Sequence, residues 1–187
     1  FVMQMDDDIN LGEDCLERMF KLLIRLGPGN AIGPYYLNPT SLLPIQKFDL
    51  GFVGFLKSVN AFIFAAAPWG IARMGKITKL AVTYGTDVNF YNKDICEVEW
   101  LPGGCVLNYS QDLVLENYFP FSGKAYSEDI IHSLLRSSKN IIHHVAFQAS
   151  AVTPLDETSF SSWEDTKSEV NVRLYIIKLL GGNKFRF

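Results

Sequence analysis

The sequence predicts an α/β fold in which helices flank a mixed sheet. Short apolar runs typical of strands alternate with segments whose apolar residues recur every three or four positions. The connections between the strands are too long and too helical for an all-β sandwich. The chain has 187 residues, of which 48% are hydrophobic and 20% charged, and this is the composition of a globular protein. We expect a single domain over residues 1–187.

The first third of the chain predicts two strands and one helix. Residues 1–5 form an apolar run that ends in three aspartates, as a buried strand would. Asn10 and Glu13 have the spacing of a helix N-cap and its partner, and the apolar positions of the helix are Leu16, Met19, Phe20 and Leu23. Gly27 to Gly29 ends this helix, and residues 31–37 predict a second buried strand. From residue 38 to about residue 75 we expect an irregular stretch.

The rest of the chain predicts further strands and two helices. We expect strands at 79–84 and 96–101, whereas 105–109 fits either a strand or the start of a helix. Ser127, two acidic residues and a helical apolar spacing predict a helix that ends near residues 138–140. Ile141 and Ile142 predict a short strand, and 162–180 predicts a final helix closed by two glycines.

Charge and cysteine usage narrow the classes of function. Seventeen Lys and Arg against twenty Asp and Glu give a net charge of −3, so no electrostatic argument favours nucleic acid as a partner. The three cysteines form no CxxC pair, which fits a reducing cytoplasm. The apolar run 58–72 contains Pro68 and is shorter than a membrane span. Residues 62–69 fit either buried core or a peripheral membrane or partner contact.

Asp6, Asp7 and Asp8 form the first candidate site. Neighbouring carboxylates repel one another unless water or a cation neutralises them. Their hard oxygen ligands suit Mg²⁺, Mn²⁺ or Ca²⁺, and the alternate residues Asp6 and Asp8 can face a common ion. A solvated turn is the equal alternative.

An EF-hand calcium loop is a competing interpretation of the same segment. Asp6, Asp8, Asn10 and Glu17 fall on positions 1, 3, 5 and 12 of such a loop. Against it, Leu11 stands where the loop requires glycine, and the preceding segment predicts a strand rather than a helix.

Four short motifs follow one another along the chain. They are an apolar run ending in Asp6-Asp7-Asp8, Trp100-Leu101-Pro102-Gly103-Gly104, Ser127-Glu128-Asp129, and Ile141-Ile142-His143-His144. In this order they resemble the inverting family-2 glycosyltransferases of GT-A fold, especially rhamnosyltransferase-like bacterial enzymes that build surface polysaccharides. The resemblance extends to the AIGPYYLNP and RLYIIKLL segments and so covers most of the chain.

The resemblance implies an enzyme that moves one sugar from a nucleotide-sugar donor to a saccharide or lipid-linked acceptor. Asp8 and Asp6 match the DxD motif that holds Mn²⁺ or Mg²⁺ on the donor diphosphate, with Asp7 beside it. Asp129 matches the general base that takes a proton from the acceptor hydroxyl, and Glu128 precedes it in the ED pair. A single in-line displacement then inverts the anomeric carbon.

The resemblance also assigns the histidine pair and the WLPGG segment to this site. His143 matches a position that completes the metal or diphosphate site, and His144 is its close competitor; an ordinary packed pair is the equal alternative. Trp100, Gly103 and Gly104 match the segment that shapes the acceptor pocket, where an aromatic face stacks on sugar and glycine allows close approach. Core packing is the alternative for Trp100.

Two features depart from the family. Its members have an N-terminal nucleotide-binding half before the DxD strand, so we expect a partial GT-A domain, from the DxD strand to the C-terminal helix, whose exposed sheet edge favours association. No QxxRW motif follows His144, which favours single-sugar transfer. We expect a cytoplasmic enzyme, soluble or peripheral to the membrane. The rival interpretations are a calcium- or carbohydrate-binding module without turnover, and an inactive transferase fragment that acts as an interaction surface.

Overall fold

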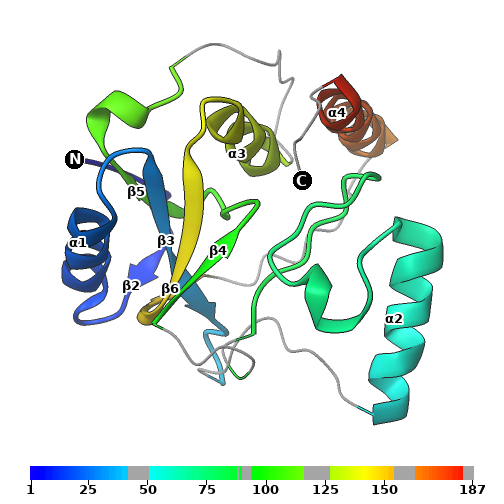
Figure 1. Cartoon of the computed structure of the whole chain (residues 1–187), viewed down its shortest axis with the longest axis horizontal. Helices are drawn as coiled ribbons and strands as arrows, with labels where there is room; N and C mark the ends of the chain where they lie inside the picture. Colours follow the sequence, from blue (N-terminus) through cyan, green and yellow to red (C-terminus); the bar gives the residue numbers. More distant parts are fainter. Residues whose placement is uncertain (42–50, 88, 90–93, 116–126, 154–162, 183–187) are drawn as a thin grey trace.

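The fold is α/β, as the sequence predicts. The computed structural model describes residues 1–41, 51–87, 89, 94–115, 127–153 and 163–182 (Figure 1). The described strands form one mixed six-stranded sheet, made of β1 (Val2–Met5), β2 (Asn10–Leu11), β3 (Asn30–Leu37), β4 (Ile95–Val98), β5 (Cys105–Asn108) and β6 (Ile142–Val152). The described helices are α1 (Cys15–Leu26), α2 (Gly51–Ala65), α3 (Glu128–Ser138) and α4 (Trp163–Gly182), with short 3₁₀ turns η1 (Gly70–Arg73) and η3 (Ser110–Asp112).

The sheet has the strand order β1-β5-β3-β6-β2. Strand β4 also pairs with β6, at residues 143–146, whereas β2 pairs with residues 151–152 of β6. Strands β3 and β6 are parallel, whereas the four other described pairs are antiparallel. Because β5 is antiparallel to both β1 and β3, the strands β1, β3 and β6 all run in one direction. Their carboxyl ends therefore meet at one edge of the sheet, which we call the carboxyl edge. In open α/β sheets this is the edge where ligands bind.

Helices cover both faces of the sheet (Figure 1). Helix α1 buries Met19 and Leu23 against Ile32 and Leu107 on one face. Successive strand residues point to opposite faces, and α3 lies over the other face, where its Ser133 hydroxyl accepts a hydrogen bond from the N–H of Leu101 at 3.1 Å. Helix α4 packs on α3 through an apolar cluster of Ile130, Ile131, Leu134, Val172 and Ile176.

Strand β1 corrects one detail of the prediction. The strand itself is confirmed, but its residues are half-buried or exposed rather than buried. Among the described strands β1 pairs with β5 alone, so it forms an edge of the sheet. The apolar run alone could not distinguish an edge strand from a central one.

The sequence predicts an irregular stretch from residue 38 to about residue 75, but part of this stretch is helical. It contains α2, whose residues are apolar on nearly every side, so its sequence has no amphipathic period to detect. Within the described part of the chain, no helix combines the length and apolar character that crossing a bilayer requires.

The boundaries of several other elements differ from the predicted ones. Helix α1 begins after Asp14, and Asn10, expected as its cap, lies in β2 instead. Segment 79–84 forms one isolated bridge, Ile77 to Thr83, rather than a strand, and β4 ends at Val98. Segment 105–108 is a strand, which settles the open alternative, and β6 runs for 11 residues where a short strand was predicted.

Asn30 joins the end of α1 to the sheet. Its side-chain amide donates to the carbonyl oxygens of Leu26 and Gly27 at 3.3 and 3.2 Å, and its amide oxygen lies 2.8 Å from Nε2 of His144. The last carbonyls of a helix have no partner within the helix. Asn30 therefore supplies that partner and also holds the His144 ring.

We expect Asn30→Ala to lower the free energy of unfolding by about 1–2 kcal/mol, because it leaves the carbonyls of Leu26 and Gly27 and the buried His144 imidazole without these contacts. Urea unfolding monitored by circular dichroism measures the change. The matched control is Asn60→Ala at an exposed position of α2, which should change the free energy by less than about 0.5 kcal/mol. Equal effects of the two substitutions would contradict the role of Asn30.

Candidate active site

The acidic triplet lies at the carboxyl edge. Asp6 follows β1 directly, and its backbone N–H donates to the carbonyl of Gly104 at 2.9 Å, which ties the triplet to the turn before β5. All three aspartates are exposed, while Ile9 after them is buried in the core under α1. The chain therefore anchors both ends of the triplet and leaves the carboxylates accessible to a ligand.

A cavity of about 350 Å³ opens at this edge. Four of the residues singled out in the sequence line it, namely Asp6, Asp8, Trp100 and Gly104. Three tyrosines add to its wall: Tyr35 and Tyr36 at the end of β3, and Tyr84 from the segment between η1 and β4. Carboxylates and aromatic rings thus share one cavity.

The WLPGG segment is held from two sides. The indole N–H of Trp100 donates to the carbonyl of Tyr84 at 3.1 Å, and the Leu101 N–H is bound by Ser133 of α3. At Gly104 a Cβ would lie 3.0 Å from Ile9 and 3.1 Å from the Tyr36 hydroxyl oxygen. Only glycine fits there without displacing its neighbours, so the backbone turn itself forms part of the cavity wall.

Asp129 lies beside the same turn, in the first turn of α3. A Cβ placed on Gly103 would come within 3.5 Å of the Asp129 Cβ, and one carboxylate oxygen of Asp129 accepts the N–H of Ile130 at 2.8 Å. Burial raises the pKa of Asp129 to about 6, with a further rise from Glu128, against the lowering effect of the Ile130 N–H. Asp129 and Gly103 do not line the cavity, but Gly103 lies between Pro102 and Gly104, which do, and Asp129 lies next to Gly103.

Glu128 is exposed and lies near enough to the acidic triplet for the charge of Asp6 to act on its carboxylate. Burial of part of its side chain raises its pKa, and the nearby charge of Asp6 raises it further. The structure therefore brings the two acidic motifs, 120 positions apart in the sequence, into one negatively charged neighbourhood. Such a cluster is stabilised by a bound cation.

The residues present suit one kind of metal site. Among the described residues no group of three or more His, Cys, Asp or Glu side chains is arranged to hold a metal ion. Asp6 and Asp8 are the acidic residues in the described lining of the cavity, and Mg²⁺ is commonly bound by one or two carboxylates together with substrate phosphates. The pair therefore fits a divalent cation that completes its coordination with phosphate oxygens, and not a closed protein cage.

His143, predicted as a metal ligand, does not join this site. His143 pairs with Ala31 of β3, and both Ala31 and Val2 of β1 pair with Asn108 of β5, so His143 lies level with Val2. Val2 is four residues, or roughly 13 Å along the strand, from Asp6. Its ring is buried near Arg136 of α3, and burial followed by that positive charge lowers its pKa to about 3. The sequence places the histidines at the end of a short strand, whereas in the structure they lie at the start of β6.

His144 and Asp7, both predicted beside the donor diphosphate, also lie outside the cavity lining. His144 points to the α1 face of the sheet, where its ring contacts Asn30. Asp7 is exposed within the turn between Asp6 and Ile9.

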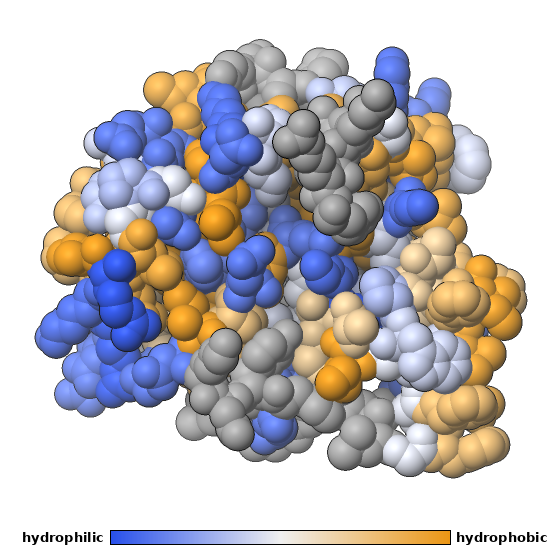
Figure 2. All heavy atoms as spheres, viewed as in Figure 1, coloured by the Kyte–Doolittle hydropathy of each residue, from blue (hydrophilic) through white to orange (hydrophobic). Residues whose placement is uncertain are grey.

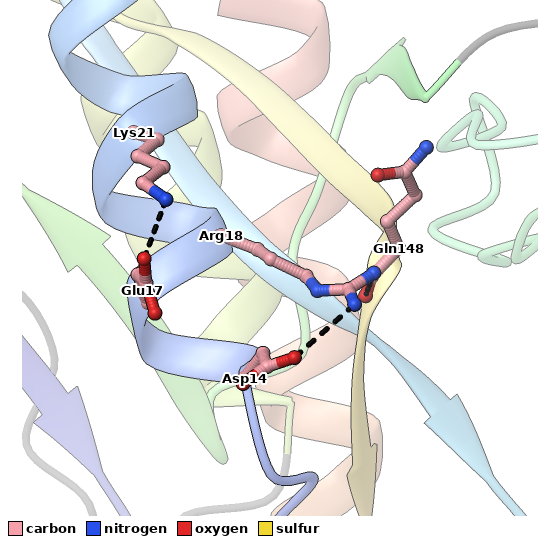
Figure 3. Close-up of polar contacts among 5 residues, drawn as sticks. All are labelled: Asp14, Glu17, Arg18, Lys21 and Gln148. Carbon is pink, nitrogen blue, oxygen red and sulfur yellow. Dashed lines mark hydrogen bonds and ion pairs between the residues drawn. The ribbon is translucent and has the colours of Figure 1, made fainter.

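The EF-hand interpretation also fails on the geometry. Asn10 pairs in β2 with Val152 of β6. Glu17 lies inside α1 and forms an ion pair with Lys21, next to the pair of Arg18 with Asp14 (Figure 3). Arg18 also donates to the carbonyl of Gln148 at 3.1 Å. Glu17 is therefore part of the helix surface and not the last ligand of a calcium loop.

Sequence reasoning missed the tyrosines of the cavity. Tyr35 and Tyr36 lie at the end of a strand parallel to β1, and that position was available as a signal once the acidic triplet had been recognised. Tyr84 lies in a segment that forms an isolated bridge, Ile77 to Thr83, so no parallel strand end marks its place at the cavity.

Comparisons with protein families, with curated proteins and with solved structures find no match for this chain.

The raised pKa of Asp129 makes a prediction about stability. The carboxyl titrates at about 6 in the folded chain and near 3.8 in the unfolded chain, so the folded chain binds more protons between these values. This contribution to stability is fully present below pH 3.8 and is lost as the pH rises through about 6. We therefore expect the free energy of unfolding of Asp129→Asn, relative to the unsubstituted chain, to increase between pH 4.5 and pH 7 in urea titrations.

The control for this measurement is Asp14→Asn, which makes the same change at the exposed start of α1. Its relative stability should not rise over the same pH range. A pH-independent difference between Asp129→Asn and the unsubstituted chain would contradict the raised pKa.

Proposed function

We propose that this chain carries the catalytic carboxylates of an inverting, metal-dependent glycosyltransferase of GT-A type. It would move one sugar from a nucleotide-sugar to a saccharide or lipid-linked acceptor, as in surface polysaccharide synthesis. The observation that carries the proposal is the convergence of three sequence motifs at one cavity: Asp6 and Asp8, the turn at Trp100 to Gly104, and Asp129 behind that turn.

The acidic pair supports the donor half of the reaction. A bound Mg²⁺ or Mn²⁺ offsets the negative charge that grows on the departing nucleoside diphosphate. Asp6 and Asp8 would hold the ion, with phosphate oxygens as the remaining ligands. Their exposure leaves the necessary coordination positions open.

Asp129 supports the acceptor half. A general base works best when its pKa lies near the working pH, and burial brings the pKa of Asp129 to about 6. At neutral pH the carboxylate is ionised, so it can take the proton of an acceptor hydroxyl as that oxygen attacks the anomeric carbon. Gly103 lies next to Asp129, since a Cβ at Gly103 would be in ordinary contact with the Asp129 Cβ.

Aromatic residues support a sugar ring as the ligand. Tyr35, Tyr36, Tyr84 and Trp100 line one cavity. Aromatic faces present an apolar surface with polar edges, which suits the stacking of a sugar and the hydrogen bonding of its hydroxyls.

We expect Asp129→Asn to reduce sugar transfer at least 100-fold, because the amide cannot accept the acceptor proton. The assay is release of nucleoside diphosphate from a panel of nucleotide-sugars in the presence of Mn²⁺ and candidate acceptors. Binding of the nucleoside diphosphate by calorimetry should change less than threefold. The matched control Asp14→Asn should retain full transfer, and comparable turnover by the Asp129 variant would exclude this residue as the base.

Asp6→Asn and Asp8→Asn should each weaken Mn²⁺ binding about tenfold or more when a nucleoside diphosphate is present, because each removes a charged oxygen ligand. Electron paramagnetic resonance of free Mn²⁺ measures the affinity. Asp14→Asn again serves as the control with the same loss of charge. Unchanged Mn²⁺ affinity in both variants would remove the acidic pair from the metal site.

A carbohydrate-binding module without turnover is the second candidate, because the aromatic lining alone would serve it. That function needs the tyrosines and Trp100 but not Asp129. Saccharide binding without release of nucleoside diphosphate from any donor would favour it over the transferase.

A further inference from the structure

Helix α2 is packed with its small residues inward. Gly54, Ser58, Ala61 and Ala65 are buried, and they recur at the three- and four-residue spacing of one helix face. Ala61 and Ala65 pack with Ala67 and with Val82 and Tyr84. The face that usually carries the large core residues is here the face of least volume.

The large apolar side chains of α2 point outward instead. Phe52, Ile63 and Phe64 are 74%, 63% and 71% exposed, and Phe55, Leu56 and Phe62 are each about half exposed. Phe62 and Phe64 are two positions apart, so with 3.6 residues per turn the exposed apolar arc that they bound spans roughly 200°. Figure 2 shows hydrophobic residues along the right-hand edge of the molecule, over α2.

This helix is fixed to the body of the protein by polar contacts. The guanidinium of Arg73 in η1 donates to the Ser58 hydroxyl at 2.8 Å, and Ser58 donates to the carbonyl of Gly54 at 2.8 Å. Trp69 packs edge-on against Phe55 and Phe62, with ring centroids 5.7 and 6.2 Å apart, yet stays 49% exposed. The outward aromatic surface is therefore held in place by the small inner face and by η1.

The charge of this region differs from that of the rest of the chain. Residues 51–75 contain no Asp or Glu, although the whole chain has twenty acidic residues and a net charge of −3. Lys57 lies exposed on α2, whereas Arg73 in η1 is buried. An apolar surface that carries an exposed lysine and draws no acidic side chain from residues 51–75 is complementary to an anionic lipid headgroup layer.

We propose that α2, together with Trp69 and Ile71, docks into the surface of an anionic lipid bilayer. The apolar stripe by which a surface helix packs on protein is upward of about 100° wide, whereas acyl chains are fluid and can surround the roughly 200° arc that α2 exposes. Trp69 at the border of the arc suits the headgroup level, where tryptophan is enriched. This docking does not depend on the proposed function.

The docking surface adjoins the cavity. Arg73 lies over the ring of Tyr84, 5.3 Å from its centroid, and Tyr84 lines the cavity beside Trp100. A docked α2 would thus hold one wall of the cavity close to the headgroup layer. On the proposed function, this geometry favours a lipid-linked acceptor over a free saccharide.

The test is sedimentation of the protein with vesicles of three parts phosphatidylcholine and one part phosphatidylglycerol. We expect the unsubstituted protein to bind, and Phe52→Ala/Phe64→Ala to reduce the partition coefficient about 100-fold, since each phenyl group withdrawn from water contributes about a factor of ten. The matched control is Ile24→Ala/Leu174→Ala, which removes two exposed apolar residues from α1 and α4 and should leave binding unchanged.

Three outcomes would overturn the docking proposal. The first is absence of vesicle binding, and the second is equal binding by both double variants. The third is evidence that these residues pack against protein. It would be either a melting temperature lowered by several degrees in Phe52→Ala/Phe64→Ala, or a dimer that ultracentrifugation detects and this variant abolishes. Vesicle binding requires no sugar donor, so its failure leaves the transferase tests intact, and failure of transfer leaves this test intact.

Discussion

The insertion of β5 between β1 and β3 is the constraint on which the site depends. Because β5 is antiparallel to both neighbours, it starts at the edge where β1 and β3 end. The turn that leads into β5 therefore meets the residues that follow β1, and the contact is fixed by the hydrogen bond from Asp6 to Gly104. Helix α3 reaches the same place because Ser133 binds the backbone of Leu101. One strand position thus gathers three motifs that lie far apart in the chain.

The electrostatics of the edge follow from this gathering. Asp6, Glu128 and Asp129 all carry negative charge in a region that is partly withdrawn from water, and the pKa values of Glu128 and Asp129 rise in consequence. A fold gains no stability from such an arrangement, since ionised Asp129 opposes folding at neutral pH. Clusters of perturbed carboxylates that cost stability are characteristic of functional sites. A bound cation would offset this cost.

The sequence predicted the parts of the site that depend on local pattern. Asp6, Asp8, Trp100 and Gly104 line the cavity, and Asp129 lies in the first turn of a helix, because strand ends and helix starts have strong local signals. His143 was misplaced because its position depends on the register of β6, which residues 30 to 37 of β3 determine from outside the motif. Helix α2 was missed because a helix with apolar residues on nearly every side has no period to read. In both cases the deciding information was tertiary.

The inverted packing of α2 explains why its aromatic residues stay outside. A helix that buried Phe55 and Phe62 against the segment around Val82 and Tyr84 would stand several Å further from it than one that buries Ala61 and Ala65. Arg73 could not then reach Ser58, and its contact with the Tyr84 ring would be lost. Close approach by small residues thus keeps Tyr84 at the cavity wall, and the same packing forces the large side chains outward. The exposed surface and the shape of the cavity are therefore two results of one packing arrangement.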